Sequence, residues 1–160
     1  MPVCKKHRSS RPQTNHNFIL MKNILFLFSL LIGTQLSAQT VVGKWKTIDD
    51  ETGKPKSVVE IFEKNGQLYG KVIKLFRAPH EDQNPSCKDC TGDRKGQKVL
   101  GMEIIRGLKK SGKEYSGGTI LDPKNGKVYD CKLWVENGKL QVRGYIAFFF
   151  RTQTWLPYKD

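Results

Sequence analysis

Two cysteines, Cys87 and Cys90, have the clearest potential for chemistry in this sequence. A Cys-x-x-Cys pair can close a disulfide, work as a redox dithiol, or supply two of the four ligands of a structural zinc ion. A redox dithiol commonly has its thiol pKa lowered at a helix N-terminus, and no helical periodicity surrounds this pair. Zinc would need two further ligands, for which His80 is the nearest histidine. The compartment of the protein decides between these chemistries.

A leader pattern upstream indicates that compartment. The segment Met21–Gln39 combines a positive start at Lys22, an apolar run over Ile24–Ile32 and a small-residue exit at Leu36–Ala38, as a secretory signal peptide does. The apolar run is shorter than the ~20 residues that span a bilayer, so we expect no transmembrane segment after signal removal. We predict export to the periplasm or the extracellular space. The predicted parts are a non-structural extension or unused upstream start (1–20), the signal peptide (21–39) and one domain (40–160).

Export favours a disulfide between Cys87 and Cys90, because thiols in an oxidising compartment tend to be paired. The alternative is a metal site formed by Cys87, Cys90 and His80. Cys131 is then left without a disulfide partner in the exported chain. It lies on the apolar face of a predicted strand, where burial as a small hydrophobic side chain accounts for it.

No other pattern in the sequence points to catalysis. Hydrolysis or group transfer would need paired carboxylates, a Ser/His/Asp set or a glycine loop that binds phosphate. We find none of these patterns in the sequence. The one histidine after the leader, His80, stands next to Glu81 and Asp82 in a predicted loop, where a solvated side chain is expected. We therefore expect a non-enzymatic protein without a cofactor, and keep a redox or metal-dependent enzyme that uses Cys87 and Cys90 as an alternative.

The charge of the chain is basic. The formal net charge is +13, and residues 40–160 carry 23 basic and 15 acidic residues, a net charge of +8. Basic and acidic residues alternate and form no block, so we predict no nucleic-acid partner. A basic exported domain can still meet anionic lipid or glycan, which makes an anionic envelope surface a candidate partner.

Three Asn-Gly pairs, at Asn65, Asn125 and Asn137, separate segments rich in β-branched and aromatic residues. Asn-Gly between such segments indicates a hairpin with a type I′ turn, because both central residues need positive φ. The sequence therefore predicts mostly antiparallel β structure. The predicted strands are Val42–Thr47, Ser57–Glu63, Gln67–Phe76, Met102–Leu108, Glu114–Leu121, Lys127–Glu136, Lys139–Ala147 and Phe149–Pro157.

About eight short strands with short connections favour an all-β, single, small, antiparallel up-and-down β-barrel, since closure removes exposed edges and a Greek key needs long crossovers. One long loop, 77–98, interrupts the pattern and carries the Cys-x-x-Cys. An eight-stranded barrel is just wide enough to be filled by side chains or to hold one small ligand. We expect a monomer.

Two segments at opposite ends of the domain resemble the lipocalin and calycin arrangement. These are Gly43-Lys44-Trp45 on the first strand and Arg151-Thr152-Gln153-Thr154-Trp155 on the last. The resemblance implies that Arg151 packs over Trp45 and closes the end of the barrel, with Gly43 and Trp155 in structural roles.

The domain as a whole resembles the exported bacterial family catalogued as domain of unknown function 2147. The segments that carry the resemblance are Gly101–Leu108, Gly117–Tyr129, Val142–Tyr145 and Arg151–Trp155. The family implies a lipocalin-like barrel in the bacterial envelope and gives no catalytic residues to transfer. It also leads us to expect a glycine just before Arg151, where this chain has Phe148-Phe149-Phe150; we expect these rings to crowd that end of the barrel.

The function predicted from the sequence is binding of one small, partly apolar or amphiphilic ligand or lipid inside the barrel, without catalysis. An envelope interaction module that uses its basic face is the alternative. A ligand site at the strand ends would use aromatic and hydrogen-bonding side chains. The candidates are Tyr69, Arg106, Tyr129, Arg143, Tyr145 and Gln153.

Overall fold

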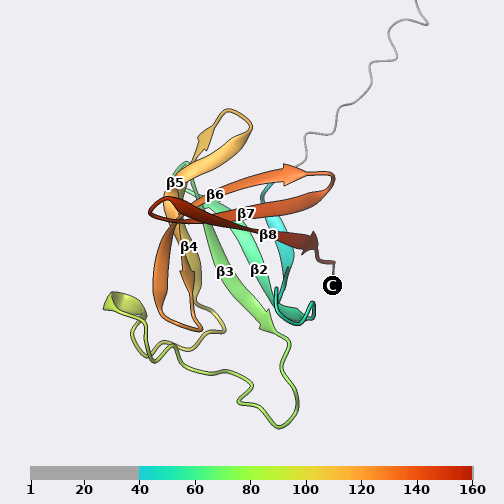
Figure 1. The fold of residues 1–160 in the computed structure, drawn as a ribbon, viewed down its shortest axis with the longest axis vertical. Helices are drawn as coiled ribbons and strands as arrows, with labels where there is room; N and C mark the ends of the chain where they lie inside the picture. The colour runs from blue at the N-terminus through green and yellow to red at the C-terminus, as the bar shows by residue number, and fades with distance from the viewer. Residues whose placement is uncertain (1–39, 160) are drawn as a thin grey trace, which may run out of the picture. The chain divides into compact units, whose positions relative to one another are not determined.

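The computed structural model describes residues 40–159, so the predicted extension and signal peptide lie outside the described residues. The described residues form eight antiparallel strands closed into a barrel (Figure 1). The strands are β1 (Gly43–Ile48), β2 (Pro55–Lys64), β3 (Gln67–Leu75), β4 (Glu103–Ser111), β5 (Glu114–Asp122), β6 (Lys127–Glu136), β7 (Lys139–Ile146) and β8 (Phe149–Pro157).

Each strand pairs with the next one along the chain, and β8 returns to β1 through the pairs Trp45–Pro157 and Lys46–Leu156. This is the all-β, up-and-down, eight-stranded barrel that the sequence predicts. All eight predicted strands overlap observed ones. The largest shift is in β4, which starts at Glu103 and continues to Ser111, three residues beyond the predicted end.

Two of the three Asn-Gly turns have the predicted geometry. Asn65 and Asn137 lie at φ 53° and 50° and are each followed by a glycine with positive φ, as a type I′ turn requires. The third is different, because in the β5–β6 turn Gly126 has positive φ and Asn125 does not. Asp122 closes that turn instead: its carbonyl accepts the amide of Gly126 at 2.9 Å.

The interior of the barrel is packed with side chains at one end. Along β6, Cys131 and Leu133 are buried while Asp130 and Glu136 are exposed, the alternation expected of a sheet with one face against a core. The turns β2–β3, β4–β5 and β6–β7 lie at this closed end. The largest fully buried side chains here are Ile61, Leu68, Leu108, Leu133 and Leu140.

The long connection between β3 and β4 runs over residues 76–102, somewhat wider than the predicted loop 77–98. It contains one short 3-10 helix, η1 (Gly92–Arg94). Figure 1 shows the connection at the end of the barrel opposite the β4–β5 hairpin. Among residues 40–159, no helix is long and apolar enough to cross a membrane.

Candidate functional site

The end of the barrel opposite the closed one contains a cavity of about 1370 Å³. The β1–β2 loop, the β3–β4 connection, the β5–β6 turn and the β7–β8 hairpin all contribute to its wall. An eight-stranded barrel leaves such a space only where small or short side chains face inward. The buried apolar part of the wall consists of Val72, Val99, Ile104, Leu121, Val142 and Trp155.

A chain of polar contacts runs along the inward face of β8, from the mouth of the cavity toward its floor. Arg151, Gln153 and Trp155 alternate along the strand and all line the cavity. Asp50, from the β1–β2 loop, accepts hydrogen bonds from Arg151 Nη2 at 2.5 Å and from Gln153 Nε2 at 2.6 Å. The indole N–H of Trp155 donates to Gln153 Oε1 at 3.3 Å. The cavity therefore has polar groups at its mouth and apolar groups below them.

The conformation of the β1–β2 loop holds Asp50 in place. Its neighbour Asp49 accepts hydrogen bonds through Oδ1 from the Thr52 hydroxyl and the Thr52 amide, both at 2.9 Å. The Thr52 hydroxyl, followed by the amide, lowers the pKa of the Asp49 carboxyl. Asp49 is thus an ionised cap of its own loop, a common use of Asp in turns. The loop closes over the cavity mouth with Asp50 directed at β8.

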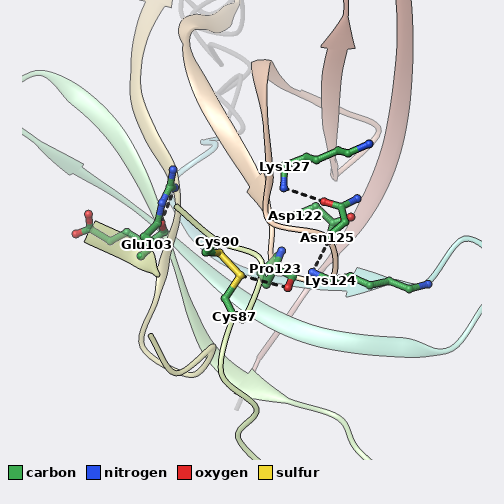
Figure 2. Close-up of a disulfide and its surroundings, with 9 residues drawn as sticks. Cys87, Cys90, Glu103, Asp122, Pro123, Lys124, Asn125 and Lys127 are labelled. Atoms are coloured by element: carbon green, nitrogen blue, oxygen red, sulfur yellow. Dashed lines mark hydrogen bonds between the residues drawn. A yellow bond between two sulfur atoms is a disulfide. The ribbon is translucent and has the colours of Figure 1, made fainter. Parts of the chain in front are cut away.

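A second rim of the mouth is formed by the segment around Cys87 and Cys90, of which Pro85, Ser86, Lys88 and Asp89 line the cavity. Cys87 and Cys90 form a disulfide (Figure 2). This is the disulfide that the sequence predicts. Cys87 Sγ lies 3.4 Å from the carbonyl oxygen of Pro123 in the β5–β6 turn. The turn and the disulfide segment are in close contact, since a Cβ on Gly126 would lie 2.1 Å from the Asp89 carbonyl oxygen.

The disulfide segment is also tied to itself and to β4. The backbone of Cys87 exchanges hydrogen bonds with Gln97 and Gly96 at 2.9 and 3.0 Å. Arg106 of β4 donates two hydrogen bonds to Asp93, at 3.1 and 2.7 Å, and these bonds lower the pKa of the Asp93 carboxyl. The buried Arg94 donates from Nη1 to the Glu103 carbonyl at 3.3 Å. We call residues 85–101 together with the β5–β6 turn the stapled rim.

The structure brings two of the six candidate ligand residues, Tyr129 and Gln153, into the cavity wall. Arg143 and Tyr145 lie on the outer face of β7, because Val142 and Gly144 occupy the inward positions. Arg106 holds Asp93, as described above. Tyr69 stacks on Phe62 with ring centroids 6.0 Å apart. None of these four lines the cavity.

Two residues of the cavity mouth, Asp50 and Arg151, were not among the six ligand candidates, and Arg151 was expected only in a structural role. The alternation Arg151, Gln153, Trp155 is visible in the sequence and places all three on one face of the last strand. Asp50 has no such signal, because its role depends on how the β1–β2 loop folds back.

The expected stack of Arg151 over Trp45 is wrong. Trp45 pairs with Pro157 near the closed end, and Arg151 precedes Pro157 by six residues, about 20 Å along a strand at ~3.3 Å per residue. Arg151 therefore lies at the cavity mouth, where it forms an ion pair with Asp50. Trp45 is buried and donates its indole N–H to the Val41 carbonyl at 2.8 Å.

The alternative metal site at Cys87, Cys90 and His80 does not form, because the disulfide consumes both thiolates and His80 is exposed. Among the described residues, no three Cys, His, Asp or Glu side chains gather as a metal site would need. Cys131 is a free, buried thiol whose pKa burial raises to about 12. A thiol of that pKa is a packing residue and not a nucleophile.

Phe148, Phe149 and Phe150 do not crowd the barrel end as expected. All three are exposed, at the apex of the β7–β8 hairpin. Phe149 and Phe150 border the cavity, and Phe148 does not. The high exposure of all three rings shows that they stand around the mouth and do not fill the barrel end.

An eight-stranded, antiparallel barrel with one filled end and one open end defines a lipocalin-like fold. A solved structure with this fold is protein HP1028 from the human pathogen Helicobacter pylori, described as belonging to the lipocalin family; the TM-score is 0.64 at 21% sequence identity, over 76% of this chain and 84% of that one. The chain belongs to the family described as "Uncharacterized protein conserved in bacteria (DUF2147)", whose model matches residues 43–156. No curated protein matches the sequence.

Proposed function

We propose that this protein is an exported binding protein, without catalytic activity, that holds one small amphiphilic molecule in the cavity at the open end of its barrel. The observation that carries the proposal is the division of the cavity wall. Buried apolar side chains such as Val142 and Trp155 form its deep part, and Arg151, Gln153 and Asp50 form its mouth. Ligand pockets combine an apolar lining with a few convergent polar groups in this way.

The polar mouth suits a ligand whose head group replaces Asp50. Arg151 and Gln153 both donate to the same oxygen of the Asp50 carboxylate, so a ligand carboxylate could be held by the same two donors. A ligand head group would displace Asp50 together with its loop, whereas Arg151 and Gln153 would keep their places in the pairing of β8 with β7. We therefore infer a long-chain acid or a similar anionic amphiphile as the ligand class.

Gly144 gives the sharpest test of the cavity. It lines the cavity, and a Cβ there meets Tyr129 Cβ only at 3.6 Å, which is ordinary van der Waals contact. Gly144→Leu should fill the cavity without disturbing the strand, and weaken binding of the fluorescent fatty acid cis-parinaric acid at least tenfold. Gln141→Leu, on the outer face of the same strand, is the matched control and should bind as the wild type does. Equal binding by the wild type and Gly144→Leu would refute the cavity as the site.

The head-group assignment is tested at the mouth. Asp50→Asn removes the internal competitor and should strengthen cis-parinaric acid binding, whereas Arg151→Gln should weaken it. Asp50→Asn should not strengthen binding of the corresponding fatty alcohol, and Arg151→Gln should not weaken it. Native mass spectrometry of protein purified from its own host would then identify the molecule that it carries. A protein that is consistently empty and binds no probe would contradict the proposal.

A further inference from the structure

The apex of the β7–β8 hairpin carries apolar side chains that the barrel does not bury. Phe148 is 98% exposed, Phe149 77%, Phe150 60% and Ile146 58%. With Ala147 between them, they surround the two-residue connection between β7, which ends at Ile146, and β8, which begins at Phe149. We call Ile146–Phe150 the aromatic tip. Single exposed apolar residues are ordinary, but a contiguous group of this kind marks an interaction site.

The size and shape of the aromatic tip limit what it can contact. With about 200 Å² for a whole aromatic side chain, the exposed fractions of its three phenylalanines correspond to about 500 Å² of apolar surface. A specific protein interface takes about 800 Å² from each partner, with a well-packed centre. A projecting hairpin apex offers less than that and is convex. It fits a soft apolar medium better than a second protein surface.

The residues directly behind the aromatic tip have the chemistry of a bilayer interface. The Arg143 guanidinium lies over the Phe150 ring at 4.4 Å and over the Trp134 ring at 5.0 Å. No described carboxylate lies within 4 Å of it, and its Nε donates to the Thr152 hydroxyl at 2.8 Å. Tyr145 packs beside Phe150 with ring centroids 6.3 Å apart. Tyr, Trp and Arg are the side chains that place an apolar part in lipid and a polar part at the head groups.

The geometry points to a membrane-docking function for the aromatic tip: Phe148 and Phe149 insert into the interfacial layer of an anionic bilayer, with Arg143 and Tyr145 at the level of the phosphate groups. The net charge of +8 over residues 40–160 favours an anionic surface. Ile146, Phe149 and Phe150 also border the cavity, so docking places the cavity mouth against the lipid. The observation is independent of the ligand site, and either can fail without the other.

Phe148 is the position at which to test docking, because it is exposed and does not line the cavity. The purified protein should co-sediment with vesicles of phosphatidylcholine and phosphatidylglycerol at 7:3. Phe148→Ser should reduce the bound fraction at least fivefold, and Phe148→Trp should retain it. The matched control is Val42→Ser, an exposed apolar position at the closed end, which should bind as the wild type does.

Insertion is read out directly by a fluorophore at the apex. Phe148→Cys in a Cys4→Ser background can be labelled selectively with a nitrobenzoxadiazole thiol reagent, because Cys131 is buried and Cys87 and Cys90 form a disulfide. The label should brighten and shift to the blue with vesicles, and the same label at Val42→Cys should not. The proposal is overturned if the protein does not bind vesicles, or if Phe148→Ser binds them as well as the wild type does. It is also overturned if sedimentation velocity shows a dimer that Phe148→Ser abolishes, because the aromatic tip would then contact a second copy of the chain.

Discussion

The two sides of the cavity mouth, the stapled rim and the aromatic tip, are built in opposite ways. The stapled rim has a disulfide, a buried arginine and an Asp93 carboxylate held by Arg106, and its disulfide segment touches its β5–β6 turn so closely that only glycine fits at position 126. The aromatic tip exposes its largest side chains. The fixed side chains of this mouth therefore lie on the stapled rim, and those available for the proposed membrane contact lie on the aromatic tip. Changes at the stapled rim should cost folding free energy, and changes at the tip should not.

The largest effect is expected at Gly126. Gly126→Ala would place a Cβ 2.1 Å from the Asp89 carbonyl oxygen, in a residue with φ 68°. Backbone cannot move away as a flexible side chain can, so we expect a loss of about 3 kcal/mol in the free energy of unfolding. Gly112→Ala is the matched control: it has φ 64° and nothing within 4 Å of the added Cβ, so only the left-handed backbone is penalised, at about 1 kcal/mol.

Urea unfolding of both variants measures the difference. Equal losses at Gly126 and Gly112 would mean that the β5–β6 turn and the disulfide segment are not held together in solution. The stapled rim would then not differ from the aromatic tip in stability.

The barrel and the disulfide were predictable because their signals are local: turn residues, alternation within a strand, and two cysteines three residues apart. The position of Arg151 was not, because whether it meets Trp45 or Asp50 depends on the register between the first and last strands. Arg143 and Tyr145 have the composition of pocket residues, but they alternate with the buried Val142, so the period of the strand already places them on the outer face. The sequence therefore predicts elements and faces here better than it predicts which residues of distant elements meet.

The next largest effect is expected at the disulfide. Replacing both cysteines, Cys87→Ser with Cys90→Ser, should lower the free energy of unfolding by about 2 kcal/mol, because the closed loop is short and removes little entropy from the unfolded chain. Dithiothreitol should produce the same loss in the wild type and no further loss in the double variant. A double variant that is still destabilised by dithiothreitol would show that the disulfide is not the reducible element.

A pH effect is expected in the stapled rim. The hydrogen bonds from Arg106 lower the pKa of Asp93 in the folded protein, so the stability they give is present above the unfolded carboxyl pKa and is lost as the pH falls through the folded value. Acidification below about pH 4 should therefore speed amide exchange in η1 before the barrel strands. Asp93→Asn should exchange fast in η1 at neutral pH and show no such acid step. An acid step that persists in Asp93→Asn would assign it to another carboxyl.

The smallest effect on stability should be at the aromatic tip. Phe148 is 98% exposed, so its ring gains almost nothing from folding, and Phe148→Ser should change the free energy of unfolding by less than about 0.5 kcal/mol. Urea unfolding in the absence of lipid measures this. A loss above about 1 kcal/mol would mean that the ring packs against the protein in solution, and the tip would then resemble the stapled rim. An unchanged stability combined with lost vesicle binding would place the whole contribution of Phe148 outside the fold, in what the hairpin contacts.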